Sequence, residues 1–480
     1  MSTDGRNQMM NKNDIVTVTI EDFTRDGEGI GRADGYTLFI KDAVIGDTVR
    51  ARITRPKKTY AYARVEEILE PSPDRVKAAC PEARRCGGCR LQELSYEKQL
   101  VFKRKVVADA LSRIGKFPVC TDSEERDGAI EVKPVAGMAD PFRYRNKAQY
   151  PIACVPVRGD GTGEHREMRI EAGFYAGRTH SLIPVRDCLL TREVNASVLD
   201  AFLRYMRENS VTAYDEKTGR GCVRHLLIRE GFSTGELLVC PVINAESLPH
   251  PDRLIRALSA VPGVRSICVN INRKPGNVIL GDVTKALFGD PFITDQLGGL
   301  SFRISPRSFY QVNPVQTEVL YREAVRAAGL TGKETVFDLY CGIGTISLSM
   351  AKHAKEVYGI EIIPDAVRDA RENAERNGIR NAHFYTGAAE DLVARGEFER
   401  GVPCPRADVV VLDPPRKGCD PVLIRSVLLM APERIVYVSC DPATLARDLR
   451  LFADGEGDVS YRIQLIQPVD MFPRTGAGMI

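Results

Sequence analysis

The sequence predicts a multidomain protein: an N-terminal small β-barrel of OB-like type, a mixed α/β central domain with a cysteine cluster, and a C-terminal Rossmann-like α/β domain. Three observations predict this fold class. Alternating apolar residues interrupted by glycines open the chain, closely spaced cysteines follow a proline-rich stretch, and strand and helix patterns alternate in the last third. At about 150 residues per domain, 480 residues suggest roughly three domains. We expect them at 1–72, 73–298 and 299–480.

The composition is that of a globular protein without membrane contact. Hydrophobic residues make up 43% of the chain and charged residues 27%, and no apolar run approaches the length that spans a bilayer. Residues 1–14 are polar and lack the apolar stretch of a signal peptide, so we expect a cytoplasmic protein, and a monomer. Because the cytoplasm keeps thiols reduced, the 13 cysteines are better explained as core residues, metal ligands or nucleophiles than as disulfides.

The first predicted domain runs from Asp14 to about Leu69 as short strands separated by glycine turns. Its segment 50–64 is basic and aromatic without an acidic residue, and its candidate RNA contacts are Arg50, Arg52, Lys57, Lys58 and Tyr60. Cations beside tyrosines suit phosphate contact and base stacking, as in barrels that bind single-stranded nucleic acid. A solvated basic face without a ligand would show the same pattern. The net charge of +3 does not decide, because binding depends on how charge is distributed.

The central region opens with a cysteine run and a helix. Cys80, Cys86 and Cys89 form a C-x5-C-x2-C pattern, and an amphipathic helix is predicted from Tyr96 to about Gly115. Further along, RYRNKAQYP at 143–151 again mixes cations with tyrosines. This second basic segment adds three candidate RNA contacts: Arg143, Arg145 and Lys147.

Alternation of strands and helices from about Leu300 predicts a parallel sheet with right-handed crossovers. The predicted strands are 335–342, 356–362, 383–387, 408–415 and 434–440. The helix between the second and third strands should begin at Pro364 and end at Asn377 and Gly378.

The first of these strands leads into a glycine turn in DLYCGIGT at 338–345. Gly342 and Gly344 allow a tight turn and the close approach of a ligand to the backbone. Glu361 closes the second strand, where an acidic residue can accept hydrogen bonds from ribose hydroxyls in dinucleotide and S-adenosylmethionine sites alike. Because the third glycine of the dinucleotide fingerprint is absent, a purely structural turn is also open here.

Two residues expected at the same edge of the sheet suggest chemistry. Asp413 begins DPPRKG after the fourth strand, and Cys440 ends the fifth strand in SCDPATLARD. Asp441 is a predicted N-cap and Pro442 the first helical residue, so the Cys440 thiol should face a helix N-terminus, which lowers a thiol pKa. A structural cysteine would normally be buried within an apolar stretch. We therefore predict that Cys440 is a nucleophile and that Asp413 is a second catalytic residue.

These segments together resemble the RNA (uracil-5-)-methyltransferases, the family of RNA 5-methyluridine methyltransferases with a TRAM domain. The barrel looks like a TRAM domain, SFYQVNP at 308–314 is similar to the family's cofactor segment, and DLYCGIGT, DPPR and SCDPATLARD follow in order. The resemblance covers nearly the whole chain and implies a class I methyltransferase domain. Besides the two glycines, it places these residues around S-adenosylmethionine or the uracil, with Cys440 as the nucleophile: Gln311, Tyr340, Thr345, Glu361 and Asp413.

Methylation at carbon 5 of uracil explains why a thiolate would be needed. Carbon 5 is a poor nucleophile, but addition of a thiolate at carbon 6 creates an enolate whose carbon 5 can attack the methyl sulfonium. A general base must then remove the proton on carbon 5 so that the thiolate can leave. The target base must also leave its stack to reach the pocket, which requires a surface that grips RNA.

The resemblance also interprets the cysteine run. In the members that act on 23S ribosomal RNA, a four-iron, four-sulfur (4Fe-4S) cluster is held by a C-x5-C-x2-C run and a distant cysteine. Here these match Cys80, Cys86, Cys89 and, in PVRDC, Cys188. Spacing alone would equally suit zinc, which also accepts four cysteines, but the resemblance favours the cluster. We expect a structural or RNA-orienting role for it, and 23S ribosomal RNA as the partner.

One departure from the family concerns the last residues. DMFP at 470–473 matches the family, in which it continues to a His-x-Glu whose glutamate is the general base. Here Met479 stands in the glutamate's place, and the apolar segment of the family's final strand is missing. This should leave an unpaired sheet edge near Ile463 to Val469, and it predicts slow resolution of the thiolate adduct.

Three alternatives are open on the sequence. The same chemistry can act on transfer RNA, or the chain can be an RNA-binding homologue with impaired turnover, which only Met479 supports. The glycine turn and Glu361 can also belong to an NAD-dependent oxidoreductase, in which DPPR and SCDPA have no role. Binding of S-adenosylmethionine or of NAD separates the last alternative from the others.

Overall fold

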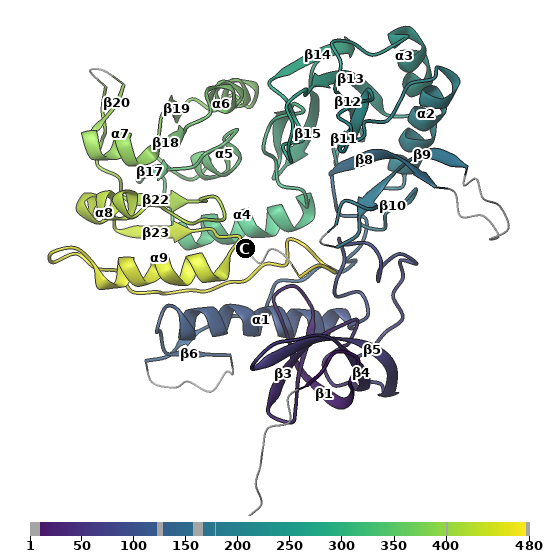
Figure 1. Ribbon diagram of the computed structural model, residues 1–480. Helices are drawn as coiled ribbons and strands as arrows, with labels where there is room; N and C mark the ends of the chain where they lie inside the picture. The colour runs from purple at the N-terminus through teal and green to yellow at the C-terminus, as the bar shows by residue number, and fades with distance from the viewer. Residues whose placement is uncertain (1–9, 122–127, 157–166, 178, 400–401, 477–480) are drawn as a thin grey trace, which may run out of the picture.

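The computed structural model describes residues 10–121, 128–156, 167–177, 179–399 and 402–476. Figure 1 shows the barrel at one end of the molecule, the long helix α1 (Tyr96–Arg113) beside it, and two sheets on opposite sides of the view beyond that helix. The central sheet and the C-terminal sheet follow the barrel along the chain. The three architectures thus occur in the predicted order.

Residues 15–70 form a closed five-stranded barrel in the order β1-β2-β3-β5-β4. Its strands are β1 (Ile15–Phe23), β2 (Gly29–Ala33), β3 (Tyr36–Lys41), β4 (Thr48–Pro56) and β5 (Tyr60–Glu70). The alternation seen in the sequence sends Ile20 and Leu38 into the barrel core. Glycine is required at Gly31 because a Cβ there would lie 2.5 Å from Cγ2 of Val18. The predicted barrel is confirmed.

Helix α1 connects the barrel to the C-terminal part of the chain. Phe102 packs edge-on against Phe23 of the barrel, with ring centroids 5.4 Å apart. Leu111 joins an apolar cluster with Ala446 of helix α9 (Pro442–Asp454). Figure 1 shows α1 lying between the barrel and α9, so the predicted helix is present and links two distant parts of the sequence.

The central region is built on a seven-stranded sheet in the order β10-β9-β8-β11-β12-β13-β14. Its strands are β8 (Lys147–Pro156), β9 (Met168–Tyr175), β10 (Leu182–Pro184), β11 (Val223–Glu230), β12 (Leu237–Ile243), β13 (Val264–Ile271) and β14 (Val283–Phe288). Helices α2 (Val194–Glu208) and α3 (Pro251–Ser259) share one apolar cluster with this sheet. Two short strand pairs lie outside this sheet: β6 (Val119–Cys120), which contacts α1, with β7 (Ile130–Glu131), and β15 (Ile293–Leu297) with β16 (Leu300–Ile304).

The last third of the chain forms a five-stranded parallel sheet in the order β19-β18-β17-β22-β23. Its strands are β17 (Thr335–Asp338), β18 (Glu356–Glu361), β19 (Ala382–Thr386), β22 (Val409–Leu412) and β23 (Arg434–Tyr437). With α9, its helices are α4 (Pro314–Ala328), α5 (Thr345–Ala351), α6 (Pro364–Arg376), α7 (Ala389–Arg395) and α8 (Pro421–Met430). A short pair, β20 (Glu397–Glu399) with β21 (Val402–Pro403), follows α7. All five predicted strands and the helix from Pro364 are confirmed.

Strand β23 is the outer strand of this sheet in the part of the chain that the structure describes, and it pairs only with β22. A cavity of about 760 Å³ lies along it and is also lined by residues 460–468. An unpaired edge is present, but β23 forms it and not, as predicted, the segment near Ile463 to Val469. The segment 463–469 does not extend the sheet; instead it bridges to residues 132–136, with Ile466 opposite Val132.

Among the described residues, no helix has the combination of length and apolar character that a membrane crossing needs.

Candidate active site

The carboxyl ends of four parallel strands meet at one edge of the C-terminal sheet. Strands β17, β18, β22 and β23 run in the same direction, and three strand pairings join them. Their ends lead directly into the turn 338–345, Glu361, Asp413 and, three residues past β23, Cys440. Because parallel strands end at the same edge, the strand order alone gathers these motifs from a hundred residues of chain.

The glycine turn forms a cradle of backbone closed by Glu361. Gly342 and Gly344 have φ angles of 55° and 84°, in the left-handed region that glycine tolerates. A Cβ at Gly344 would lie 3.0 Å from the Phe384 ring, so this position also needs a small residue. One carboxylate oxygen of Glu361 accepts a hydrogen bond from the Gly342 amide at 3.2 Å, and the other from the Ile363 amide at 2.9 Å. Glu361 is thereby fixed at the end of β18, as the sequence predicted.

Two buried polar side chains that the sequence analysis did not single out support this turn. Asp338 ends β17 and accepts a hydrogen bond from the Ser347 hydroxyl at 2.5 Å, and its second oxygen has no hydrogen-bond partner among the described residues. Burial, opposed by that hydrogen bond, raises the pKa of Asp338 to about 6. The Tyr321 hydroxyl lies 2.7 Å from Oγ1 of Thr345, the first residue of α5. The position of Asp338 directly before the glycines was a usable signal, whereas Tyr321 belongs to a distant helix and gave none.

Tyr340 lies within the glycine turn, and two isoleucines that were not predicted as site residues follow Glu361. Tyr340 is half-buried against an apolar cluster, and burial raises the pKa of its hydroxyl, with Cys419 as a further cause. Ile362 and Ile363 directly follow Glu361 and are 62% and 53% exposed. Two exposed isoleucines beside an acidic residue offer an apolar surface that suits a flat aromatic ring such as adenine.

Gln311 lies in the SFYQVNP segment, which buried groups of the central sheet hold in place. Its backbone carbonyl accepts a hydrogen bond from the Asn146 amide at 2.9 Å. The fully buried guanidinium of Arg229 on β11 donates to the carbonyls of Pro306 and Ser308. Burial lowers the pKa of Arg229 to about 10. The central sheet thus positions Gln311, although nothing in the sequence linked Arg229 to it.

Cys440 is half-buried in the loop between β23 and α9. Asp441 is the N-cap of α9, where its carboxylate accepts hydrogen bonds from the amides of Ala443 and Thr444 at 2.9 and 3.4 Å. The predicted cap and the position of Pro442 are confirmed. The expectation of a lowered thiol pKa is wrong: burial, then Asp413 and Asp441, raise the pKa of Cys440, and Arg416 only partly opposes them.

Asp413 follows β22 and is a charge neighbour of Cys440. Burial, with a further contribution from Asp338, raises its pKa to about 7. A carboxyl group with this pKa is partly protonated at neutral pH and can donate as well as accept a hydrogen bond. The site therefore holds a thiol and a carboxyl group, and the negative charge of the carboxylate disfavours ionisation of the thiol.

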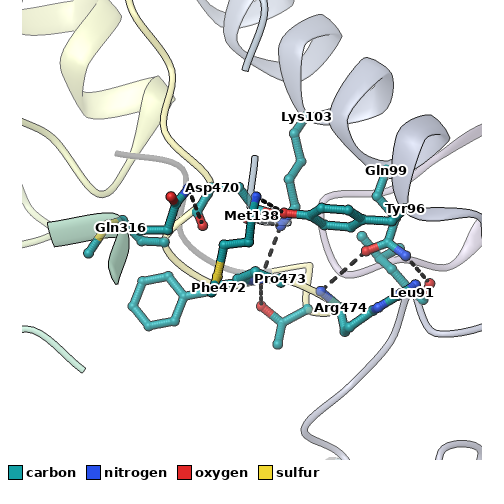
Figure 2. A network of polar contacts seen from close by, with 12 residues as sticks. Leu91, Tyr96, Gln99, Lys103, Met138, Gln316, Asp470, Phe472, Pro473 and Arg474 are labelled. Carbon is teal, nitrogen blue, oxygen red and sulfur yellow. Dashed lines mark hydrogen bonds and ion pairs between the residues drawn. The ribbon is translucent and has the colours of Figure 1, made fainter. Parts of the chain in front are cut away.

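A buried polar network fixes the chain segment 470–474 against α1 and α4 (Figure 2). The Lys103 ammonium on α1 donates to the Asp470 carboxylate at 2.5 Å, and the two side chains are 3% and 0% exposed. The Tyr96 hydroxyl donates to the same carboxylate at 2.9 Å, and the Gln316 amide of α4 donates to the Asp470 carbonyl at 3.3 Å. Lys103 and Asp470 are 367 residues apart, so the sequence gave no sign of this pair. The position of Met479 lies outside the described residues.

The predicted RNA contacts on the barrel divide into two groups. Arg50 is paired with Glu67 at 2.6 Å and Arg52 with Glu66, both from the neighbouring strand β5. The segment 50–64 contains no acidic residue, but the strand pairing places two beside it. These two arginines are therefore partly neutralised.

The second group is formed by Lys57, Lys58 and Tyr60 at the β4–β5 turn. Both lysines are exposed, and within the described residues neither side chain has an ion pair. Tyr60 packs with Phe39 and Tyr62 as three mutually touching rings, with centroids 5.6 to 5.8 Å apart. This aromatic triad (Phe39, Tyr60 and Tyr62) is half-exposed beside free cations, an arrangement that suits stacking with unpaired bases.

The three cations of the second basic segment have different environments. Arg143 pairs with Asp187 at 2.5 Å and donates to two backbone carbonyls, so its role is structural. Arg145 lies 5.6 Å from the centroid of the Phe472 ring. Burial, then the cations Arg229 and Arg145, lower the pKa of Lys147 to about 7. Arg145 and Lys147 flank Asn146, which binds the SFYQVNP segment, so both lie near the candidate cofactor site.

The four predicted metal ligands are neighbours, but their side chains are not arranged as a ligand set. Within the described residues, no group of three or more His, Cys, Asp or Glu side chains is placed to hold a metal ion. The thiols nevertheless act on one another: burial raises the pKa of Cys89 to about 12, and Cys188, Cys86 and Cys80 add to this effect. The structure thus brings the four residues together without showing a metal site.

Comparison with known proteins decides the family. Residues 285–476 match the tRNA (Uracil-5-)-methyltransferase family, and residues 11–65 match the TRAM domain. An uncharacterized RNA methyltransferase of Halalkalibacterium halodurans is 48% identical over 467 residues, which cover 97% of this chain and 96% of that protein. The chain belongs to the RNA uracil-5-methyltransferase family. A second RNA methyltransferase, from Listeria innocua, is 44% identical over the same share of both chains.

A solved structure supports the same assignment. The tRNA (uracil-54, C5)-methyltransferase of Pyrococcus abyssi, in complex with S-adenosyl-L-homocysteine, aligns with a TM-score of 0.72 and 26% identity. The alignment covers 97% of this chain and 100% of that chain. The protein is therefore an S-adenosylmethionine-dependent RNA methyltransferase with a TRAM domain. The alternative of an NAD-dependent oxidoreductase is wrong.

Proposed function

We propose that this RNA uracil-5-methyltransferase methylates carbon 5 of a uridine in 23S ribosomal RNA through a covalent adduct with Cys440. The observation on which this proposal depends is the position of Cys440. Its thiol lies at the sheet edge next to Asp413. Asp413 follows β22, which pairs with the strand of the glycine turn, and Cys440 follows the next strand, β23. One edge of the sheet thus combines a nucleophile, a partly protonated carboxyl group and a turn that can bind the cofactor. This arrangement suits transfer of a methyl group to a base held among them.

The residues of the turn fit S-adenosylmethionine, which supplies an electrophilic methyl group when bound. Glu361 is placed to accept hydrogen bonds from ribose hydroxyls, and Ile362 offers an apolar face to the adenine. The second buried oxygen of Asp338, which has no hydrogen-bond partner in the part of the chain that the structure describes, can accept a hydrogen bond from the ammonium group of the ligand. Gln311, Tyr340 and Thr345 complete the proposed binding site.

Cys440 and Asp413 have complementary roles in the proposed reaction. The Cys440 thiolate forms a bond to carbon 6 of the uracil, and the electron pair of the 5,6 double bond moves toward the oxygen on carbon 4. A protonated Asp413 can donate a hydrogen bond to that oxygen, for which its pKa of about 7 is suited. Carbon 5 then takes the methyl group from the sulfonium, whose methyl–sulfur bond breaks to leave the neutral thioether S-adenosyl-L-homocysteine. A base removes the proton on carbon 5, the 5,6 double bond forms again, and the bond between carbon 6 and sulfur breaks to release the Cys440 thiolate.

The RNA class is the finer part of the proposal. The four cysteines support ribosomal RNA, because the resemblance associates them with members that act on it. The similarity to a tRNA (uracil-54, C5)-methyltransferase favours transfer RNA as a second candidate. For either RNA, the aromatic triad, Lys57 and Lys58 are the proposed contacts on the barrel, and Arg145 and Lys147 those near the site.

We also propose that Cys80, Cys86, Cys89 and Cys188 hold a 4Fe-4S cluster. Although the four side chains are not arranged as a ligand set, two of them have amide donors: the Gly88 amide donates to the Cys86 sulfur at 3.5 Å, and the amides of Leu190 and Thr191 lower the pKa of Cys188 against the larger effect of burial. Amide donors of this kind stabilise thiolates in metal sites. Iron and acid-labile sulfide in anaerobically purified protein would support the cluster, whereas stoichiometric zinc without iron would overturn it.

A denaturing gel tests the proposed reaction. Purified protein is mixed with labelled S-adenosylmethionine and unmodified transcripts of 23S ribosomal RNA or transfer RNA. The amount of covalent protein–RNA adduct on the gel and the amount of labelled methyl group in the RNA are measured. Cys440→Ala should lose both the band and methyl transfer, by more than about a thousandfold. Cys154→Ala, which removes an exposed cysteine, is the matched control and should keep both.

The outcomes separate the candidates. A band and methyl transfer with ribosomal RNA alone support the proposal, and the same result with transfer RNA alone replaces its substrate. A band that persists supports slow resolution of the adduct, as Met479 in place of a glutamate predicts. Methyl transfer that survives in Cys440→Ala would overturn the covalent route.

A further inference from the structure

An ion pair joins the TRAM barrel to the loop of the proposed nucleophile. Nη1 of Arg25 lies 2.8 Å from Oδ2 of Asp441, and the two residues are 416 positions apart in the chain. Asp441 directly follows Cys440. The guanidinium is 47% exposed and the carboxylate 15%, so the pair lies at the protein surface with its acidic partner turned inward.

The turn that presents Arg25 is held in place from three sides. Within the turn, the Glu28 amide donates to the Thr24 hydroxyl at 3.0 Å, and the Gly27 amide donates to the Thr24 carbonyl at 2.9 Å. Gly27 has a φ angle of 79°, and a Cβ there would lie 3.0 Å from Cβ of Arg90. Arg90 belongs to the cysteine segment, residues 80–90, which contains three of the predicted metal ligands.

The chain segment fixed by the network of Figure 2 ends against the same turn. A Cβ at Gly476 would lie 2.6 Å from the Arg25 carbonyl oxygen, so this contact leaves room only for glycine. The turn between β1 and β2 is therefore packed against the cysteine segment, the 470–476 segment and the loop before α9. Its arginine is presented to Asp441 from a fixed backbone.

Asp441 has two opposing effects at this place. Its carboxylate caps α9, which stabilises the helix and fixes the loop that contains Cys440. The same negative charge lies next to Cys440 and disfavours a thiolate there. The other groups that act on the Cys440 thiol are Asp413, which also disfavours the thiolate, and Arg416, which favours it. A cation on Asp441 removes the penalty without removing the cap.

We propose that Arg25 is a positioning residue for the Cys440 nucleophile: by pairing with Asp441 it offsets the carboxylate beside the thiol and ties the barrel to the catalytic loop. The proposal rests on the proposed function, because it assumes that Cys440 reacts as a thiolate. It adds a contribution of the barrel to reactivity, besides its contact with RNA. The barrel and the catalytic loop then have to be docked correctly before Cys440 becomes fully reactive.

The test is the pH dependence of Cys440 alkylation in the full-length protein without RNA. Iodoacetamide reacts with thiolates, and mass spectrometry of peptides resolves Cys440 from the other cysteines. Arg25→Ala should move the apparent pKa of Cys440 upward and slow its alkylation at pH 7 by roughly threefold, a modest change because the arginine is half-exposed. Arg25→Lys should restore most of the rate, since it restores the charge.

Two further variants separate this role from a structural one. In an Asp441→Asn background, which keeps a capping side chain without the charge, Arg25→Ala should leave the pH profile nearly unchanged. Arg32→Ala removes an exposed arginine from β2 of the same barrel and should leave it unchanged in the wild-type background.

The results distinguish this inference from the proposed function. An unshifted pH profile in Arg25→Ala, or an equal shift in the Asp441→Asn background, would overturn the role of Arg25, even if Cys440 forms the RNA adduct. If alkylation of Cys440 leaves methyl transfer intact, the proposed nucleophile itself is wrong, whatever Arg25 does to the thiol.

Discussion

The carboxyl edge of the C-terminal sheet and the basic surface of the barrel differ in what determines the environment of a side chain. At the sheet edge, Glu361, Asp413 and Cys440 each follow a parallel strand, so the strand order brings them together. On the barrel, the charges of Arg50 and Arg52 are partly neutralised by ion pairs with two glutamates of the neighbouring strand β5. Motifs at strand ends therefore predict where site residues lie. A basic cluster predicts a surface that binds RNA only when the partners of its cations on the neighbouring strand are known.

The largest effect on stability should come from the buried pair of Lys103 and Asp470, which fixes the segment 470–474 against α1. Lys103→Met leaves the Asp470 carboxylate buried without its cation, and loss of one partner of a buried pair costs about 3–5 kcal/mol in the free energy of unfolding. Urea unfolding followed by far-ultraviolet circular dichroism measures this, since the chain has no tryptophan for fluorescence. The result measures how much the buried pair contributes to holding the segment 470–474 in place.

A surface pair on the same helix is the matched control. Lys105 pairs with Asp22 of the barrel at 2.7 Å but is 48% exposed. Lys105→Met should cost less than about 1 kcal/mol, because water screens an exposed pair. Equal losses in Lys103→Met and Lys105→Met would show that burial does not distinguish the two pairs.

The next effect concerns the pH dependence that Asp413 gives to stability. Its folded pKa of about 7 lies above the ordinary value of 3.8, so the folded state binds more protons than the unfolded state between these values. The contribution of Asp413 is then fully present at low pH and is lost as pH rises toward and through 7. Relative to Asp413→Asn, the wild type should lose on the order of 2 kcal/mol between pH 5 and pH 8.

Parallel urea titrations of the two proteins at pH 5, 6, 7 and 8 measure this difference. Asp338 has a pKa of about 6 and titrates in both proteins, so most of its contribution cancels. Identical pH profiles would mean that Asp413 is ionised in the folded protein. It could then only accept a hydrogen bond, and the donor role in the proposed reaction would fail.

Much of the fold and of the site could be predicted because local patterns determine them. Alternation and glycine turns predicted the barrel, and the alternation of strands and helices predicted the parallel sheet. The N-cap at Asp441 followed from the residue types at a helix start. Each of these signals lies within a few residues of the feature that it predicts.

What the sequence could not predict depends on contacts between distant segments. The pairs of Arg25 with Asp441 and of Lys103 with Asp470 join residues more than 300 positions apart. The pKa of Cys440 was predicted wrongly for the same reason. Its helix N-terminus was visible in the sequence, but its burial and the charge of Asp413 were not.

A smaller effect, on RNA affinity, is expected from the aromatic triad of the barrel. Tyr60→Ala removes one of its rings, and loss of a stacked base costs about 1–3 kcal/mol, or roughly tenfold in affinity. Fluorescence anisotropy with an unmodified single-stranded RNA measures the dissociation constant. Tyr60→Phe keeps the ring and should bind as the wild type does; if it binds as weakly as Tyr60→Ala, stacking is not the interaction.

The smallest effect, on the salt dependence of RNA affinity, should come from the paired arginines of the barrel. Lys57 is exposed, and among the described residues no carboxylate is paired with it, so Lys57→Ala should lower the slope of log affinity against log salt by about one. Arg50 is already paired with Glu67, so Arg50→Ala should change the slope by much less. Salt titrations of RNA binding by both variants measure the two slopes. If Arg50→Ala lowered the slope as much as Lys57→Ala does, RNA would have to displace Glu67 from Arg50. Ion pairs with the neighbouring strand would then not decide which cations of the barrel can bind RNA.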